Sequence, residues 1–264
     1  MKLRKSVWAV ALLMLLGCSR SVNRIVVGAT PAPHAEILEQ AKPILKKKGI
    51  DLEIKVFCDY VTPNLSVADK SIDANYFQHL PYLEAFEASR HLGLVSAGII
   101  HYEPLGLYSR KIRTVRDLKD GDRIAIPSDV TNEARALALL ADNGVVTLKE
   151  PGKLTATKHD IASYTVKVEL IELDAAQIPR ALSDVTAAVI NGNYAIGVKL
   201  NPAKDALLTE RSDSLAAKTY ANILAVRQAD LNRREIRELV EALQSPEIRA
   251  FIDKRYSGAV VPVK

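Results

Sequence analysis

The chain has 264 residues, of which 48% are hydrophobic and 25% charged, a composition typical of one large globular domain or of two lobes. The net charge is +5, but Lys2, Arg4 and Lys5 lie in the first 17 residues, which contain no acid, so the remainder carries only +2. A charge this small excludes the usual electrostatic argument for a nucleic-acid partner.

The N-terminus has the features of an export signal. An apolar run of about ten residues, Val7 to Leu16, follows the basic start; it is too short to span a bilayer and fits a secretory h-region. The next residues complete Leu15-Leu16-Gly17-Cys18, which resembles a bacterial lipobox. This predicts a signal peptide over 1–17, acylation of Cys18 and a lipid-anchored linker over 18–23, which would hold the protein on the extracytoplasmic face of a bacterial membrane. The alternative is an ordinary signal peptide with an incidental cysteine. If Cys18 is lipidated, Cys58 is left alone and no intrachain disulfide forms.

Strands and helices alternate in the first part of the mature chain. Apolar spacing predicts strands at 24–27, 52–57 and 94–100, and helices at 34–48, from Thr62, and at 81–92. This alternation predicts an α/β fold with a mainly parallel sheet covered on both faces.

A second α/β unit follows. It consists of strands at 105–109, 123–126, 166–173 and 187–190 and helices at 131–143 and 175–182, with a polar, less regular part at 149–165. A strand at 220–227 and two final helices return to the first unit. We therefore expect two lobes, residues 24–108 plus 222–264 and residues 109–221, with a ligand cleft between them.

Motifs for catalysis and for cofactor binding are missing from the sequence. It contains no G-x-S-x-G, G-x-x-x-x-G-K-[ST], H-E-x-x-H or C-x-x-C pattern. Its five histidines are dispersed along the chain, at 34, 79, 91, 101 and 159, and none has a carboxylate at a metal-ligand spacing. We expect a protein that is not an enzyme and that needs neither cofactor nor metal.

The stretch Asp73-Ala74-Asn75-Tyr76-Phe77-Gln78-His79 combines aromatic and polar side chains. Such a mixture suits the wall of a small-molecule pocket. In an extended segment Phe77 and His79 share one face, which we assign to a ligand, whereas Tyr76 and Gln78 have structural roles. The alternative is a strand-to-helix junction with both aromatics in the core.

Polar groups lie at the ends of predicted strands. Arg135 lies one turn into a helix whose N-terminus favours anions, so it could present a bidentate fork to a carboxylate. It could equally pair with Glu133 or Asp129 on the surface. Asn191 follows an apolar strand and Asn222 lies inside another, and a buried asparagine needs partners from the backbone or from a ligand.

Four motifs carry a family resemblance across nearly the whole chain. Besides the lipobox, these are DYVTPN (59–64) with DANYFQH (73–79), IPSDVTNEARAL (126–137), ELDAAQIPRAL (172–182) and AVINGNYA (188–195). In order and spacing they resemble the NlpA-type lipoproteins, which are the methionine-binding proteins of bacterial ABC importers. One departure is Val130, where the family commonly has proline.

The resemblance implies a two-lobed type II periplasmic-binding-protein fold that closes on a free amino acid. Carried over residue by residue, Tyr60, Phe77 and His79 would line the side-chain pocket. Arg135, with help from Asn132, would bind the carboxylate, and Asn191 and Asn222 would bind the amino group and the remaining polar edges.

The implied partners are L-methionine, an ABC importer permease with its ATPase subunits, and the membrane through the N-terminal lipid. The alternatives are a binder of another amino acid or a short peptide, and a surface lipoprotein for adhesion or antigen display with a vestigial pocket.

Overall fold

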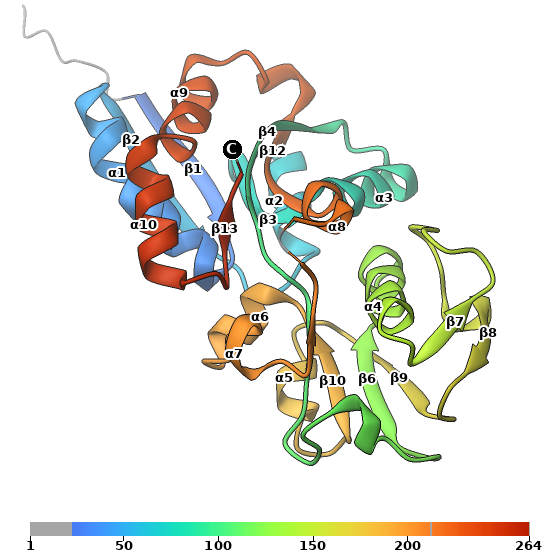
Figure 1. Cartoon of the computed structure of the whole chain (residues 1–264). Helices are drawn as coiled ribbons and strands as arrows, with labels where there is room; N and C mark the ends of the chain where they lie inside the picture. The colour runs from blue at the N-terminus through green and yellow to red at the C-terminus, as the bar shows by residue number, and fades with distance from the viewer. Residues whose placement is uncertain (1–22, 212, 264) are drawn as a thin grey trace, which may run out of the picture.

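The computed structural model describes residues 23–211 and 213–263, which form two lobes around two separate sheets (Figure 1). The predicted signal peptide (1–17) and the predicted lipidation site Cys18 lie outside the described residues. Within the described part, none of the helices combines the length and the apolar character that a membrane span requires.

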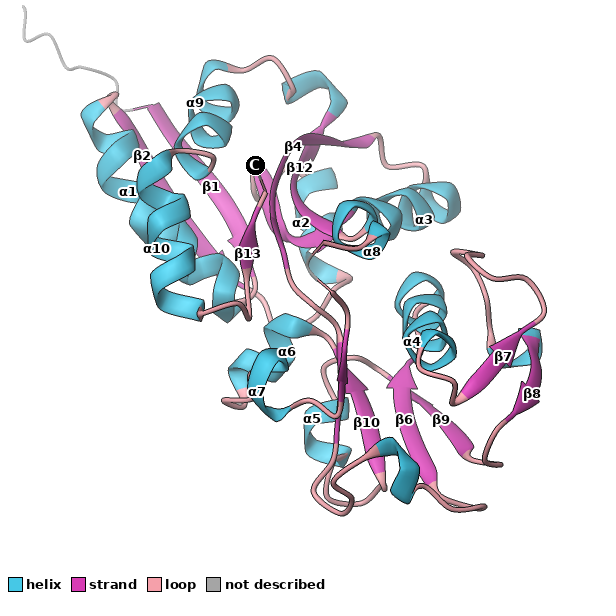
Figure 2. Cartoon of the chain, viewed as in Figure 1, coloured by secondary structure: helices cyan, strands magenta, loops and turns pink. Residues whose placement is uncertain are grey.

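The first lobe contains a six-stranded sheet (Figure 2). Its strands are β1 (Asn23–Ala29), β2 (Ile50–Val56), β3 (Ala74–His79), β4 (Leu94–Tyr102), β12 (Ala221–Arg227) and β13 (Val261–Pro262). They lie in the order β13-β4-β12-β3-β1-β2. β1 pairs in parallel with β2 and β3, whereas β12 runs antiparallel between β3 and β4, so the returning strand closes the sheet of the first lobe.

Helices cover both faces of this sheet. One face carries α1 (Glu36–Lys47), α9 (Arg234–Leu243) and α10 (Pro246–Tyr256), and the other carries α2 (Thr62–Ala68) and α3 (Leu80–Arg90). Alternate residues of a strand point to opposite faces. Accordingly, Leu224 and Val226 of β12 pack with the first set of helices. Ile223 and Ala225 pack with the second set.

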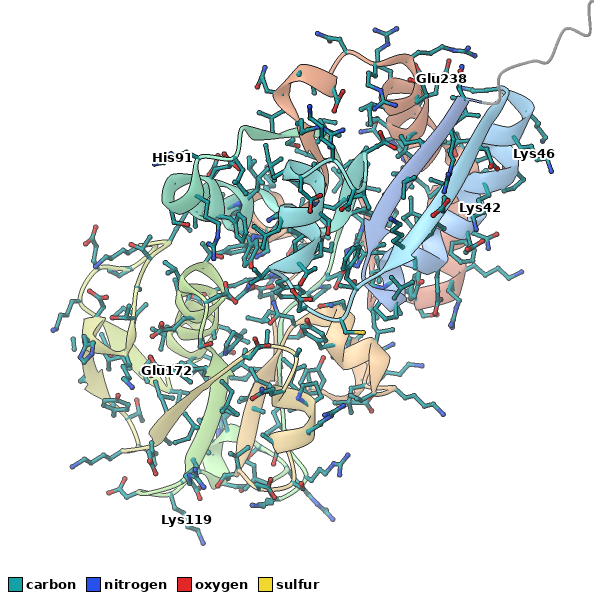
Figure 3. The ribbon with its side chains drawn as sticks, turned by 180° about the vertical axis from the view of Figure 1, so that it is seen from behind. Lys42, Lys46, His91, Lys119, Glu172 and Glu238 are labelled. Atoms are coloured by element: carbon teal, nitrogen blue, oxygen red, sulfur yellow. The ribbon has the colours of Figure 1, made fainter. Side chains whose placement is uncertain are left out.

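The surface of α1 shows why this segment is helical. Its apolar side chains at 37, 38, 41 and 45 recur at helical spacing and are buried. Lys42 and Lys46 point outward from the same helix, as Glu238 does from α9 (Figure 3). A turn, η1 (Pro31–Ala35), precedes α1 and brings His34 into the interior.

The second lobe contains a five-stranded sheet in the order β11-β5-β10-β6-β9. The strands are β5 (Gly106–Tyr108), β6 (Arg123–Pro127), β9 (Glu169–Leu173), β10 (Ala187–Ile190) and β11 (Leu208–Thr209). α4 (Val130–Asp142) covers one face, and α5 (Ile178–Ala181) and α6 (Gly192–Gly197) cover the other. The remaining elements of the whole described chain are β7 (Val146–Leu148), β8 (Ile161–Tyr164), α7 (Pro202–Asp205), α8 (Leu215–Thr219) and the short helical turns η2 (Val115–Asp117), η3 (Lys158–Asp160) and η4 (Gln228–Asp230).

Three details differ from the sequence expectations. The lobe boundary predicted at 108 is wrong, because β5 pairs with β10 and β11 in the second sheet and the first crossing therefore lies between β4 and β5. The part predicted to be irregular (149–165) contains β8, which forms an antiparallel hairpin with β7. The strand predicted from 166 begins only at Glu169. Short strands of three or four residues carry too few alternating positions to reveal their partner.

Candidate functional site

A cavity lies between the two lobes. The seven residues predicted to bind a ligand all line it: Tyr60, Phe77, His79, Asn132, Arg135, Asn191 and Asn222. Gln78, Tyr82, Glu103, Gly192 and Asn193 complete its wall. Residues far apart in the sequence thus form a single site.

Aromatic rings form one part of the wall. The Tyr60 ring lies 5.6 Å from that of Phe77 and 5.8 Å from that of Tyr82. The Tyr82 hydroxyl donates to the carbonyl of Tyr60, and the Tyr60 hydroxyl donates to Oδ1 of Asn193 at 2.6 Å. The second bond joins the first lobe to α6 of the second lobe, so the aromatic group also helps to hold the lobes together.

A β-bulge in β3 explains how three successive residues contribute to the wall. Along the pairing with β12, Gln78 lies opposite Ile223 and Tyr76 opposite Leu224, so Phe77 has no partner. A bulge breaks the alternation of a strand, and bulges often re-aim side chains next to functional sites. Phe77, Gln78 and His79 therefore all line the cavity. Tyr76 is fully buried and its hydroxyl bonds to a ring nitrogen of His101, in keeping with the structural role predicted for it.

His79 is held in one neutral tautomer. Its Nδ1 accepts from the backbone N–H of Tyr82, so Nε2 carries the proton and donates to Oδ1 of Asn132 across the lobes, at 3.2 Å. Burial, reinforced by the positive charge of Arg135, lowers the pKa of His79 to about 3. The imidazole is therefore neutral at physiological pH. Both of its nitrogens are already hydrogen-bonded, so it presents an uncharged surface to the cavity.

This pKa shift predicts a pH-dependent loss of stability. The pKa of His79 is about 3 in the folded protein and 6.5 in the ordinary case, so the unfolded chain takes up a proton first as the pH falls below 6.5. Between pH 7.5 and pH 5, the free energy of unfolding of the wild type should fall by about 2 kcal/mol relative to that of the non-titrating His79→Gln variant. Urea unfolding of ligand-free protein at both pH values measures this shift. The same substitution at the exposed His159 is the control, and an equal shift there would contradict the assignment.

Arg135 is buried, and its main partner is an acid far away in the sequence. Its Nε and Nη2 donate to the two carboxylate oxygens of Glu210 at 2.9 and 2.7 Å, and Nη2 also donates to the carbonyl of Glu103. The bidentate hydrogen bonds expected for a ligand carboxylate are thus made to Glu210. The alternative of a surface pair with Glu133 or Asp129 is wrong. Nη1 takes no part in these bonds. Arg135 can therefore offer a ligand carboxylate one charged nitrogen that is held in place by Glu210.

Asn132 connects the polar groups of the two lobes. Its Nδ2 donates to the carboxylate of Asp129, and its Oδ1 accepts from His79 and from Nδ2 of Asn191 at 2.7 Å. These partners occupy the Asn132 amide, which favours a positioning role over the predicted direct help to Arg135. In contrast, Oδ1 of Asn191 is buried and has no hydrogen-bond partner among the described residues. A buried acceptor without a partner is costly, so this oxygen is available to a ligand.

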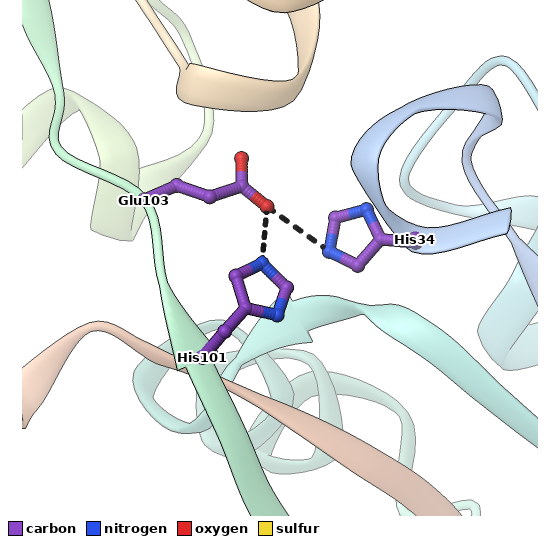
Figure 4. A group of neighbouring side chains, drawn as sticks. All are labelled: His34, His101 and Glu103. Carbon is purple, nitrogen blue, oxygen red and sulfur yellow. Dashed lines mark hydrogen bonds and ion pairs between the residues drawn. The ribbon is translucent and has the colours of Figure 1, made fainter. Parts of the chain in front are cut away.

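Sequence reasoning missed Glu103, a buried carboxylate in the cavity wall. It lies just after β4, two residues beyond His101, and its Oε1 bonds to His101 Nε2 at 2.7 Å and lies 3.2 Å from His34 Nε2 (Figure 4). Burial raises the pKa of Glu103, whereas the attraction of His34, the charge of Arg135 and a backbone N–H of Asn193 oppose that rise. The available signal was the His-x-Glu spacing at a strand end. His34, 67 positions before His101, could not be connected to it by spacing.

Comparison with known proteins shows similarity along nearly the whole chain. The sequence model described as NlpA lipoprotein matches residues 25–264. The methionine-binding lipoprotein MetQ of Bacillus subtilis (strain 168) is 41% identical over 251 residues, which cover 94% of this chain and 90% of that protein.

Solved structures agree with this similarity. An ABC transporter, periplasmic substrate-binding protein from Coxiella burnetii is 44% identical with a TM-score of 0.85, covering 90% of this chain and 100% of that one. A nutrient binding protein from Burkholderia cenocepacia bound to methionine is 42% identical with a TM-score of 0.86, covering 91% and 100%. The predicted two-lobed α/β binding-protein fold is confirmed.

Proposed function

Because this chain belongs to the NlpA lipoprotein family, we propose that it is a substrate-binding protein that captures L-methionine between its lobes and delivers it to an ABC permease. It acts by binding and release, without catalysis. The interlobe cavity carries the proposal, since both lobes supply groups suited to a zwitterion with an apolar side chain.

The polar part of the cavity suits the carboxylate of an amino acid. Nη1 of Arg135 would donate to it, and the bonds to Glu210 would hold the guanidinium in position. The guanidinium also lies 4.4 Å from the ring centroid of Tyr220, which shields it from solvent. A carboxylate that leaves water needs such a charged donor, because desolvation otherwise outweighs the contacts. Asn191 and Asn222 would serve the remaining polar atoms.

The aromatic part suits an unbranched thioether. Tyr60, Phe77 and Tyr82 would surround it, each methylene group contributing about 0.8 kcal/mol on burial. Sulfur–aromatic contacts would add roughly 0.3–1.5 kcal/mol. This wall favours methionine over small or charged amino acids. The polar part of the cavity argues against a vestigial pocket. A buried group without a partner, such as Asn191 Oδ1, is costly unless a polar ligand pairs with it.

Closure of the lobes would be driven by the ligand. Tyr60 bonds to Asn193 and His79 bonds to Asn132, so each pair joins one lobe to the other across the cavity. A ligand that contacts both lobes stabilises this closed arrangement over an open one, because its full contacts exist only when the lobes meet. Lipidation of Cys18 would keep the protein beside the permease and its ATPase subunits.

Calorimetry with a series of amino acids tests this function. We expect one-to-one binding of L-methionine, with norleucine weaker and L-alanine weaker by a factor of at least about 100, because alanine lacks roughly 3 kcal/mol of apolar burial. Equal affinities for methionine and alanine would show that the aromatic wall does not contact the ligand side chain.

A further inference from the structure

Three buried side chains next to the cavity form a cluster, defined here as the Glu103 cluster: Glu103, His34 and His101 (Figure 4). Both imidazole Nε2 atoms point at the same carboxylate oxygen, Oε1, from 2.7 Å (His101) and 3.2 Å (His34). His34 comes from η1, His101 from the end of β4, and Glu103 from the crossing that leads to the second lobe. The fold therefore brings the three groups together at the junction of the lobes.

The second nitrogen of each ring fixes its tautomer. Nδ1 of His34 lies 2.6 Å from the Thr30 hydroxyl, and Nδ1 of His101 bonds to the Tyr76 hydroxyl. If each hydroxyl donates, both Nε2 atoms carry the proton. Nε2 of His101 then donates to the carboxylate of Glu103, and Nε2 of His34 donates to Oδ1 of Asn222 at 3.1 Å. Burial lowers the pKa of His34 to about 4 and that of His101 to about 3, so both rings are neutral at physiological pH. All four ring nitrogens then have partners, and the carboxylate is oriented without receiving a countercharge.

Among the described residues, no charged cation pairs with this carboxylate. Within the described part of the chain, the basic side chains in ion-pair range of the Glu103 carboxylate are these two neutral imidazoles. Arg135 bonds to the backbone carbonyl of Glu103 and pairs its charge with Glu210. The carboxylate accepts from His101 Nε2 and from a backbone N–H of Asn193, but a buried anion that has donors and no cation is still costly. Glu103 nevertheless lines the cavity, as does Asn191 with its partnerless oxygen.

We propose that Glu103 binds the free α-ammonium group of the ligand, and that His101 is a positioning residue that holds its carboxylate toward the cavity. The inference rests on the proposed function and adds a ligand class: amino acids with an unblocked amino group. An N-acylated amino acid or a peptide bearing methionine at its C-terminus has no cation there. An α-hydroxy acid likewise leaves the carboxylate unpaired.

Calorimetry with three ligands tests the proposal: L-methionine, its α-hydroxy analogue and N-acetyl-L-methionine. For the wild type we expect both analogues to bind at least about 100-fold more weakly than methionine, since a buried charge is left unpaired. In Glu103→Gln the ratio between methionine and the hydroxy analogue should fall to less than about tenfold. If wild-type protein binds the analogues as well as it binds methionine, the inference fails and the proposed function stands. If methionine itself does not bind, both fail.

Two variants of His101 separate positioning from general structural damage. His101→Gln keeps a donor near the Nε2 position and should retain the wild-type ratio between methionine and the hydroxy analogue. His101→Leu removes the donor and should lower that ratio toward the value of Glu103→Gln. Equal ratios in the two folded variants would overturn the positioning role. Titration of ligand-free wild type with Zn²⁺ gives a further check: one-to-one zinc binding that disappears in Glu103→Gln would assign the cluster to a metal and overturn the proposal.

Discussion

Arg135→Ala is expected to weaken methionine binding by roughly 1,000-fold, because the ligand carboxylate would be buried without its charged donor. The same change should lower the free energy of unfolding by about 3–5 kcal/mol, since Glu210 would remain as a buried, unpaired acid. From the sequence, Arg135 is expected to bind a ligand carboxylate, and the bond to Glu210 is not foreseen. The buried pair with Glu210 makes the stability loss part of the expected result, and it has to be measured by urea unfolding beside the calorimetry.

Arg135→Lys separates the two effects. Lysine keeps a positive charge for Glu210. It lacks the planar guanidinium, so it cannot donate to Glu210 and to the ligand carboxylate at the same time in the geometry of Arg135. We expect it to recover part of the stability while methionine still binds at least about 30-fold more weakly, the value of one charged hydrogen bond. Arg123→Ala is the matched control in the same lobe, because the Arg123 side chain is half exposed and lies 3.7 Å from Glu169 at the surface. A folded Arg135→Lys protein with wild-type affinity would refute the carboxylate assignment.

Gly192→Ala is expected to reduce methionine affinity at least tenfold and stability by about 1–3 kcal/mol, the usual range for overpacking. Gly192 begins α6 directly against Glu103. An added Cβ would come within 2.6 Å of the Glu103 Cβ and 2.8 Å of its Oε2, so the carboxylate would have to move. Calorimetry and urea unfolding measure the two effects.

Gly197→Ala provides the control at the other end of the same helix. An added Cβ at Gly197 meets nothing within 4 Å, and alanine is a better helix former than glycine. Binding should stay at the wild-type level and stability should be equal or slightly higher. If Gly192→Ala binds methionine as tightly as Gly197→Ala does, Glu103 does not need its observed position for binding.

The aromatic stretch 73–79 shows what local pattern can and cannot reveal. Alternation correctly separated Tyr76, which is buried beside His101, from Phe77 and His79, which line the cavity. It assigned Gln78 a structural role only, although Gln78 also lines the cavity while it bonds to Asn64 and Asn75. The bulge opposite β12 causes this difference, and a bulge depends on pairing with a strand more than 140 residues later in the sequence.

Long-range partners account for the other differences. Glu210 and His34 are each brought to the site by a distant segment, so no spacing in the sequence connects them to Arg135 or Glu103. The histidines appeared dispersed for the same reason. Residues at or soon after a strand end, such as Asn191 and Tyr60, could be predicted, because strand ends that face the same cleft collect ligand-binding groups. The lobe boundary was misplaced by a few residues because β5 is only three residues long.

The most direct measurement of the central claim is a calorimetric titration of the ligand-free chain with L-methionine. Unfolding, dialysis and refolding remove any ligand that co-purifies, and mass spectrometry verifies its removal. We predict saturable one-to-one binding of L-methionine that is strongly weakened in Arg135→Lys. A refolded, verified ligand-free protein that gives no binding with L-methionine would contradict the proposed function.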